Sequence, residues 1–135
     1  MDYPLGSFPR FGHQERWARE RRARAIANSV ISRRNTAAYH LNVEIASFNK
    51  LVQLANSMTP QSDEGAKTVA AIHRQLLNIG AKLESGRRVY FKRLGRILHT
   101  IAVSTNTMPF LHNADEKTLA KTAENVGRDA LFERR

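Results

Sequence analysis

The sequence contains neither proline nor glycine from His13 to Met58, a run long enough for a helix of many turns. In its second half the apolar residues recur at intervals of three and four, the spacing of one helical face, and towards the N-terminus this stripe thins to alanine. We predict either one helix of about 45 residues, about 68 Å at about 1.5 Å per residue, or two helices, 13–35 and 36–58, bent near Asn35. The apolar stripe consists of Leu41, Ile45, Phe48, Val52 and Ala55.

The positive charge of the chain is concentrated in two short segments. The chain of 135 residues carries 22 Lys and Arg against 12 Asp and Glu, a net charge of +10. Residues 10–34 hold eight arginines and two glutamates, a net +6, residues 82–96 hold six cations and one glutamate, a net +5, and the rest sums to −1. The alternative is a pair of solvated helix faces, but such faces usually interleave acids with the cations. Charge this unbalanced indicates an anionic polymer as the partner.

The first basic segment places arginines on every side of the expected helix, with alanines between them. Such a helix fits a groove, or the space between a nucleic acid and a neighbouring subunit, better than a flat surface. The guanidinium fork suits phosphate oxygens, and the Asn and Gln residues that read bases are sparse here, so we predict backbone binding with little sequence preference. The predicted nucleic-acid-binding residues of this segment are Arg10, Arg16, Trp17, Arg19, Arg21, Arg22, Arg24, Arg33 and Arg34.

The second basic segment belongs to a helix predicted over 60–104. The apolar period of this helix passes through Tyr90, which is therefore expected in the core. Arg88, Lys92 and Arg96 follow one another at intervals of four on the opposite face and form a straight cationic ridge. We predict this ridge as a secondary phosphate-binding surface. Three of the glycines in this helix indicate either a kink or fraying point or the close approach of another backbone: Gly80, Gly86 and Gly95.

Residues 1–12 hold two prolines and two glycines, which favour an extended N-terminal arm over a helix. A floppy terminus is the simplest interpretation of such a segment. The arm also carries four large apolar side chains, which are unusual in a solvated tail, so we predict that it packs on a neighbouring subunit. These predicted subunit-contact residues are Tyr3, Leu5, Phe8 and Phe11.

The remaining signals complete an all-α fold. Thr59 and Pro60 are typical of an N-cap and first helical position, and Asp63 and Glu64 complement the dipole of the following first turn. A capping box predicts another helix start, in which Asn113 caps and Glu116 reaches back, followed by a third helix over 114–132. Alternating β patterns are negligible. The sequence therefore predicts one all-helical domain, 13–135: a long antiparallel helical hairpin with a basic N-terminal helix and a shorter third helix.

Enzyme and metal chemistry find little support in the residues. The chain has no cysteine, and its five histidines show no metal-binding spacing. Glycine-rich phosphate loops and nucleophile-elbow motifs are absent from the sequence. We therefore predict no catalytic residue, no metal ligand and no cofactor. The apolar runs are four residues or fewer, too short to span a bilayer, and the proline-containing N-terminus does not resemble a signal peptide.

The order of these parts resembles the major capsid proteins of filamentous and rod-shaped archaeal double-stranded DNA viruses. The matching pieces are PLGSFPRFG at 4–12, ERWARERRARA at 15–25 and the long helices on either side of Met58-Thr59-Pro60. The resemblance implies homo- or heterodimers that wrap double-stranded DNA, hold it in A-form and polymerise into a virion. By this resemblance, phosphate contacts would come from Arg16, Arg19, Arg21, Arg22 and Arg24, with Arg88, Lys92 and Arg96 as secondary contacts.

Two other classes of function remain open. One is a cytoplasmic, sequence-tolerant DNA- or RNA-binding accessory protein with a role in a nucleoid, in mobilisation or at the ribosome. The other is a helical assembly protein whose basic segment docks on an acidic protein or an anionic membrane. A membrane is the weaker partner, because residues 13–35 lack the large apolar face of interfacial helices.

Overall fold

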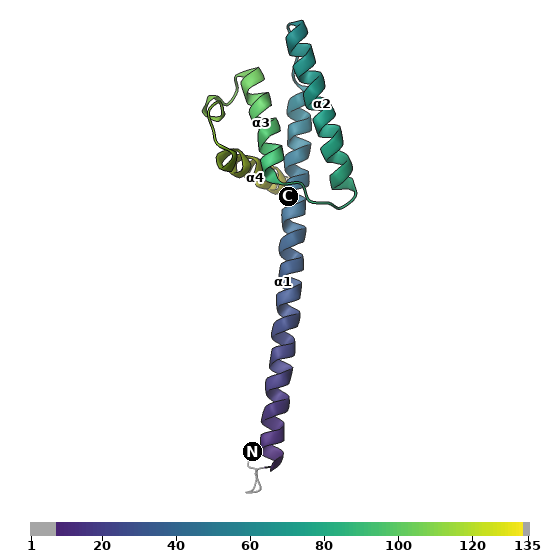
Figure 1. Ribbon diagram of the computed structural model, residues 1–135, viewed down its shortest axis with the longest axis vertical. Helices are drawn as coiled ribbons and strands as arrows, with labels where there is room; N and C mark the ends of the chain where they lie inside the picture. Colours follow the sequence, from purple (N-terminus) through teal and green to yellow (C-terminus); the bar gives the residue numbers. More distant parts are fainter. Residues whose placement is uncertain (1–7, 134–135) are drawn as a thin grey trace. The chain divides into compact units, whose positions relative to one another are not determined.

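The computed structural model describes the backbone of residues 8–133 and the side chains of residues 15–133. It is all-helical, without a strand in this part of the chain, which confirms the predicted all-α class (Figure 1). The chain divides into two compact units, Met1–Ala38 and Tyr39–Arg135, so the predicted domain 13–135 is shared between them. The helices are α1 (Phe8–Asn56), α2 (Asp63–Glu84), α3 (Phe91–Thr105), the 3-10 turn η1 (Pro109–Leu111) and α4 (Glu116–Glu133).

Helix α1 continues through Asn35 as one element of 49 residues, so of the two alternatives the single helix is the one observed. It begins at Phe8, and the prediction of an extended arm is therefore wrong for residues 8–12. Pro9 is tolerated there because the first turn of a helix requires no N–H donor from it. Residues 1–7, with Tyr3 and Leu5 among them, lie outside the described part of the chain.

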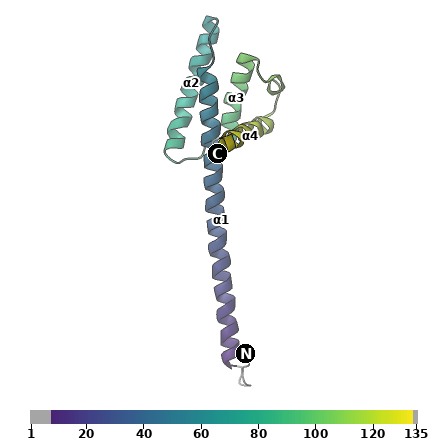
Figure 2. The ribbon, with the colours of Figure 1, turned by 180° about the vertical axis from the view of Figure 1, so that it is seen from behind.

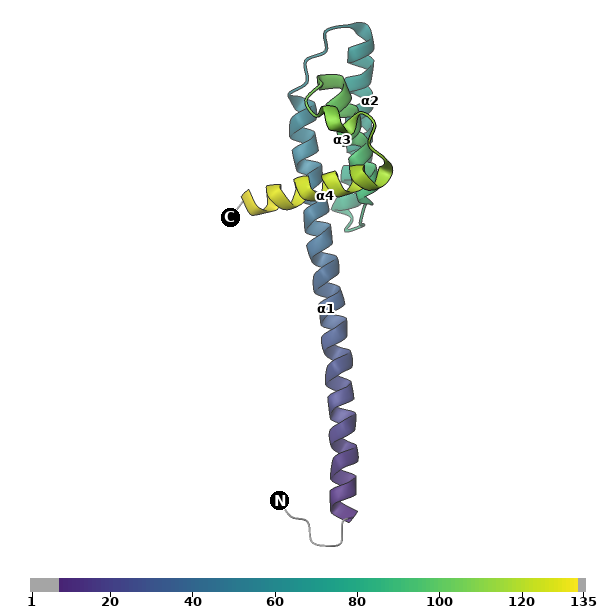
Figure 3. The same cartoon turned by 90° about the vertical axis from the view of Figure 1, so that its left-hand side faces the viewer.

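The core lies in the unit Tyr39–Arg135, where α2 runs alongside the last turns of α1 (Figures 1 and 2). Helix α4 crosses α1 in the same unit, with Gly127 against Val43 (Figure 3). Each helix contributes residues to one cluster of apolar side chains, and burial of this cluster is the main force that holds the unit together. Its most deeply buried members are Leu51, Ala55, Ile72, Leu94, Leu98, Ala102, Leu111 and Ala123.

The predicted helix 60–104 is wrong, because two helices, α2 and α3, occupy this range. Gly86 separates them in the left-handed conformation, with φ of +79°. The Gly86 N–H donates to the carbonyl of Leu83 at 3.0 Å, and the Arg87 N–H donates to that of Lys82 at 3.0 Å. These two bonds form the motif that ends a helix at a left-handed glycine. The predicted alternatives for Gly86 were a kink or fraying point and a close backbone approach; the structure instead has a helix-ending turn there, with no atom within 4 Å of an added Cβ.

Two helix starts also differ from the prediction. Helix α2 begins after Ser62, whose hydroxyl accepts a hydrogen bond from the Gly65 N–H at 3.0 Å, and not at Thr59. The predicted acidic first turn, Asp63 and Glu64, is confirmed. Helix α4 begins after Asp115, whose carboxylate accepts from the Thr118 N–H at 2.8 Å, so the predicted cap at Asn113 is wrong. In both cases the capping side chain lies two or three residues later than predicted.

Glycines allow close helix packing at three positions in this unit. A Cβ on Gly95 would lie 2.6 Å from the Leu119 carbonyl of α4, and one on Gly127 would lie 2.3 Å from the Val43 carbonyl of α1. At Gly80 the neighbour is the end of the Phe48 ring, 2.9 Å away. Close backbone approach is therefore the reason for Gly95, one of the two alternatives left open by the sequence.

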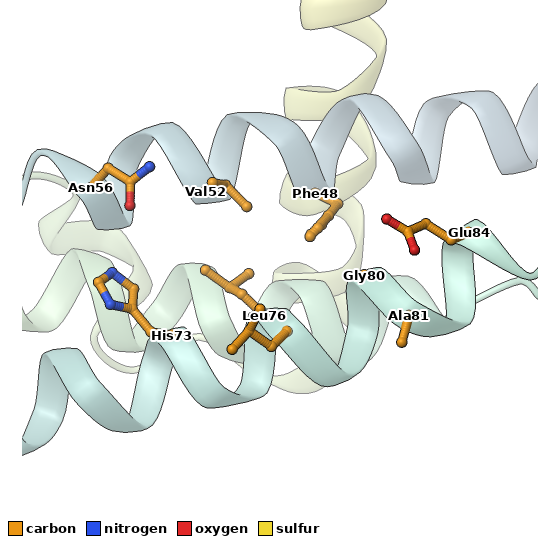
Figure 4. Close-up of a pocket in the computed structure, with 9 residues that line it drawn as sticks. Phe48, Val52, Asn56, His73, Leu76, Gly80, Ala81 and Glu84 are labelled. Atoms are coloured by element: carbon orange, nitrogen blue, oxygen red, sulfur yellow. The ribbon is translucent and has the colours of Figure 1, made fainter.

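A mostly apolar cavity of about 630 Å³ lies between α1 and α2 (Figure 4). Phe48 and Val52 line it from α1, and Leu76 lines it from α2. Asn56 and His73 lie near one end of the cavity, whereas Phe48 faces Gly80 nearer the other. Phe48 and Val52 of the predicted apolar stripe thus lie on the face of α1 that packs on α2.

Candidate nucleic-acid interface

The arginine segment, defined as residues 16–34 of α1, carries its side chains in solvent. Within residues 15–38 every side chain is exposed except that of Ala18, which is half-buried. Even the apolar side chains of Ile26 and Ile31 are 65% and 53% exposed. No side chain in 15–38 is buried, so the helix there depends on the propensity of alanine and arginine and not on a core.

The arginines are distributed around α1 because successive residues of an α-helix are rotated by about 100°. Trp17, Arg21 and Arg24 share one side, and Arg19, Arg22 and Arg33 share another. Arg16 and Arg34 lie on a third side of the helix. The observed helix therefore agrees with the predicted ring of cations.

The density of charge along the segment approaches that of a nucleic acid. Five arginines occur from Arg16 to Arg24, and eight helical steps of about 1.5 Å place them within about 12 Å. Duplex DNA carries about one charge per 1.7 Å of axis, or about seven phosphates over the same distance. Glu20 cancels one of the cations. The segment can thus neutralise about half of the phosphates that lie along it.

Few of these arginines have partners within residues 15–133. Arg19 approaches Glu15 at 4.0 Å, but both side chains are 75% exposed, so this pair adds little stability. The Arg21 guanidinium lies 5.4 Å from the ring centroid of Trp17, and the Arg33 Nε donates weakly to the Ser29 carbonyl at 3.5 Å. The arginines without an ion pair or hydrogen bond in the described part of the chain are Arg16, Arg22, Arg24 and Arg34.

Three predicted residues near the start of α1 lie outside the range of described side chains, which begins at residue 15. Arg10, Phe8 and Phe11 lie in its first turns, and only their backbone is described. The predicted roles of Arg10 in nucleic-acid binding and of the two phenylalanines in subunit contact stay predictions.

The prediction that Arg88, Lys92 and Arg96 form a straight ridge on one helix is wrong. Arg88 lies in the turn before α3, and only Lys92 and Arg96 belong to the helix. Lys92 lies 3.5 Å from the Glu116 carboxylate, and Arg96 forms an ion pair with the same carboxylate. The turn at Gly86 shifts the register, which breaks the line of three cations.

The same change of register makes the prediction that Tyr90 lies in the core wrong. This residue is the N-cap of α3 and is 78% exposed, whereas the preceding Val89 is 2% exposed and joins the core. The Val89 N–H donates a hydrogen bond to Glu44 Oε2 at 2.8 Å.

Glu44 is a buried carboxylate that connects two parts of the fold, and the sequence pattern did not predict this role. Its side chain is fully buried, and Arg88 Nε lies 3.6 Å from Oε1. Burial raises the pKa of Glu44, while the Val89 N–H and the Arg88 charge oppose this rise. The carboxylate ties α1 to the turn between α2 and α3. Its position at the edge of the apolar stripe, between Val43 and Ile45, was the available signal.

Metal-ligand groups and membrane-spanning helices are both absent from the described residues. No group of three or more His, Asp or Glu side chains within them could hold a metal ion. None of their helices combines the length and hydropathy that crossing a bilayer requires. Comparison with protein-family models, with curated proteins and with solved structures gave no match to this chain.

Proposed function

We propose that this chain is a structural protein that coats double-stranded DNA, as the major capsid protein of a helical virion does. The observation that carries the proposal is the arginine segment. It is a regular helix with cations on all sides, no buried side chain in 15–38 and four arginines without a partner in the described part of the chain.

Phosphate binding follows from the chemistry of these side chains. Each guanidinium can donate two parallel hydrogen bonds to one phosphate, and each phosphate contact releases counterions from the DNA. Alanines at 18, 23, 25 and 27 keep the helix narrow, so its backbone can approach the DNA. Because Gln14, Asn28 and Asn35 are the only amides near the arginines, sequence preference would be weak.

The coat would form from paired chains, either identical or related. Two chains carry a charge of +20, which balances about 20 phosphates or about 10 base pairs. The proposal includes the predicted antiparallel hairpin of α1 and α2. The order of contacts supports it, since Phe48 faces Gly80 while the later Asn56 lines the cavity with the earlier His73.

The decisive experiment removes four of the arginines. The variant R19Q/R21Q/R22Q/R24Q should lose affinity for a random-sequence duplex, and the slope of log Kobs against log salt should fall by about 3.6, at about 0.9 per lost phosphate contact. Fluorescence anisotropy across a salt series measures both quantities, and circular dichroism verifies that the helices remain.

A matched control removes the same charge elsewhere. The variant K67Q/R74Q/K117Q/K121Q changes four exposed cations of α2 and α4. It should bind nearly as well as the unmodified chain. Equal losses in the two variants, or undiminished binding by the first, would refute the role of the arginine segment.

Stoichiometry distinguishes a coat from an accessory protein. A coat protein should saturate duplex DNA at about 10 base pairs per pair of chains and form filaments visible by electron microscopy. Reversible binding by a small oligomer, without filaments, would favour the accessory role. Absence of any binding to random-sequence duplex at about 150 mM salt would leave protein docking as the function of the segment.

A further inference from the structure

A second cationic surface lies in a groove between α2 and α3, within the unit Tyr39–Arg135. The groove has a volume of about 390 Å³. Its floor includes Ile79 and Ile97, both buried in the core. Its polar lining comes from both helices and consists of Gln75, Asn78 and Lys82 of α2 and Arg93, Arg96 and Thr100 of α3.

The charges that line the groove all have one sign. Three of the lining side chains, Lys82, Arg93 and Arg96, are cations, and no carboxylate lines it. Lys82 and Arg93 form no ion pair with an acid among residues 15–133. Three cations on two packed helices repel one another, and an anion between them would relieve this repulsion.

The third cation, Arg96, contacts both the groove and the carboxylate of Glu116. Arg96 lines the groove but also forms an ion pair with Glu116, whose pKa is lowered mainly by the hydrogen bond from Arg96. Its side chain is 61% exposed. An anion in the groove and the Glu116 carboxylate therefore attract the same guanidinium from two sides.

The uncharged residues of the groove narrow the chemistry of the ligand. The amides of Gln75 and Asn78 can donate hydrogen bonds to oxygen acceptors, whereas the hydroxyl of Thr100 donates to the Arg96 carbonyl at 3.0 Å. Donors and cations without carboxylates suit phosphate oxygens, which accept several hydrogen bonds at once. The volume lies within the range of about 300–1,000 Å³ that is typical of sites for small molecules or single groups of a polymer.

We infer that this groove binds a stretch of the phosphodiester backbone of a nucleic acid, as a second site separate from the arginine segment. The inference rests on the proposed function, because it takes the same DNA as its ligand. The cations of this site differ from those of the predicted ridge. Arg96 belongs to both sets, Lys82 and Arg93 belong only to the groove, and Arg88 contacts Glu44 instead.

The test compares two double variants of the full chain. In K82Q/R93Q two cations of the groove are removed, and in the control K67Q/R74Q two exposed cations of α2 that do not line it are removed. The first variant should lower the slope of log Kobs against log salt by about 1.8, and the control should leave it nearly unchanged. Thermal unfolding verifies that both variants fold.

Nuclear magnetic resonance can show where the duplex binds. When a short duplex is added to the isotopically labelled chain, the amide signals of Gln75, Asn78 and Thr100 should shift, and they should no longer shift in K82Q/R93Q. If inorganic phosphate at constant ionic strength saturates the same shifts at the concentration that the duplex requires, the groove is a site for free phosphate and the inference is overturned.

The outcomes separate this inference from the proposed function. If the unmodified chain does not bind duplex DNA at all, both fail. If it binds and R19Q/R21Q/R22Q/R24Q weakens binding while K82Q/R93Q matches the control, the proposed function stands and the groove site is refuted. A lower slope in K82Q/R93Q alone supports the groove.

Discussion

Replacement of Gly127 by alanine tests the packing of α4 on α1, on which the C-terminal unit depends. The new Cβ would lie 2.3 Å from the Val43 carbonyl oxygen, 2.9 Å from Val43 Cγ1 and 3.0 Å from Ser47 Cβ. Ordinary van der Waals contact begins near 3.4 Å, so the two helices must separate by about 1 Å. The obstacle is backbone, which cannot rotate away as a side chain can.

Two opposing terms set the expected change in the free energy of unfolding. Alanine stabilises a helix interior by about 1 kcal/mol relative to glycine. Overpacking costs about 1–3 kcal/mol, and the upper end applies because a gap of about 1 Å weakens the dispersion contacts along the whole crossing. The net loss is therefore about 2 kcal/mol. For a unit of 97 residues (39 to 135) this lowers Tm by about 8–16 °C.

Gly80→Ala is the matched control for Gly127→Ala. Its Cβ would meet only the end of the Phe48 ring, at 2.9 Å, and this ring borders the cavity of about 630 Å³. The ring can turn into that space, so the gain of about 1 kcal/mol in helix propensity offsets most of the cost, and Tm should change by less than about 4 °C. Thermal unfolding followed by circular dichroism measures both variants. If Gly127→Ala unfolds at or above the temperature of the unmodified chain, α4 does not cross α1 as described.

Two carboxylates give further predictions. Burial raises the pKa of Glu44 in the folded chain above its value in the unfolded chain. Protonated Glu44 therefore contributes its full stabilisation at a pH below the pKa of the unfolded chain, and this contribution is lost as the pH rises through the pKa of the folded chain. Glu44→Gln stays neutral and should flatten the dependence of unfolding free energy on pH in urea titrations from about pH 4 to pH 7; an unchanged dependence would contradict this. Arg96 lowers the pKa of Glu116, so the small stabilisation from this exposed carboxylate is present above its unfolded pKa and is lost as pH falls. Glu116→Gln should release Lys92 and Arg96 and steepen the salt dependence of DNA binding by up to about 1.8, and a shallower dependence in anisotropy titrations would refute the competition between Glu116 and phosphate.

Helix positions that depend on local pattern were predictable from the sequence. The third predicted helix, 114–132, corresponds to α4 within two residues, and the stripe through Phe48 and Val52 is the face on which α2 packs. Ala55 of the stripe is 1% exposed, but other deeply buried residues of α1 were not predictable in this way. Val43 and Leu51 are buried because α4 and the core cover α1 beside the stripe, and one helical wheel cannot show which second face is covered.

The secondary site was mispredicted because of one backbone conformation. The ridge of three cations required an unbroken helix past Gly86, and the positive φ of that glycine ends α2 instead. Once the chain turns, Arg88 is positioned by Glu44, which lies 44 residues earlier in the sequence. A contact over that separation has no local signature, so neither the structural role of Arg88 nor the groove beside Arg93 could be read from spacing alone.

The two units differ in how many of their cations form ion pairs with carboxylates. This difference supports different roles for the arginine segment and the groove in the proposed binding of DNA. In the C-terminal unit Arg88, Lys92 and Arg96 have carboxylate partners, so a phosphate would compete with Glu44 or Glu116 for these three cations. Only Lys82 and Arg93 of the groove have no ion pair with an acid among residues 15–133. In residues 15–38 the only ion pair is that of Arg19 with Glu15, and no side chain is buried. Phosphates can therefore bind the arginine segment without displacing a core contact or a strong internal partner. Because binding there costs the fold little, the arginine segment should bind DNA first and most strongly, and the groove should add contacts once the DNA is held.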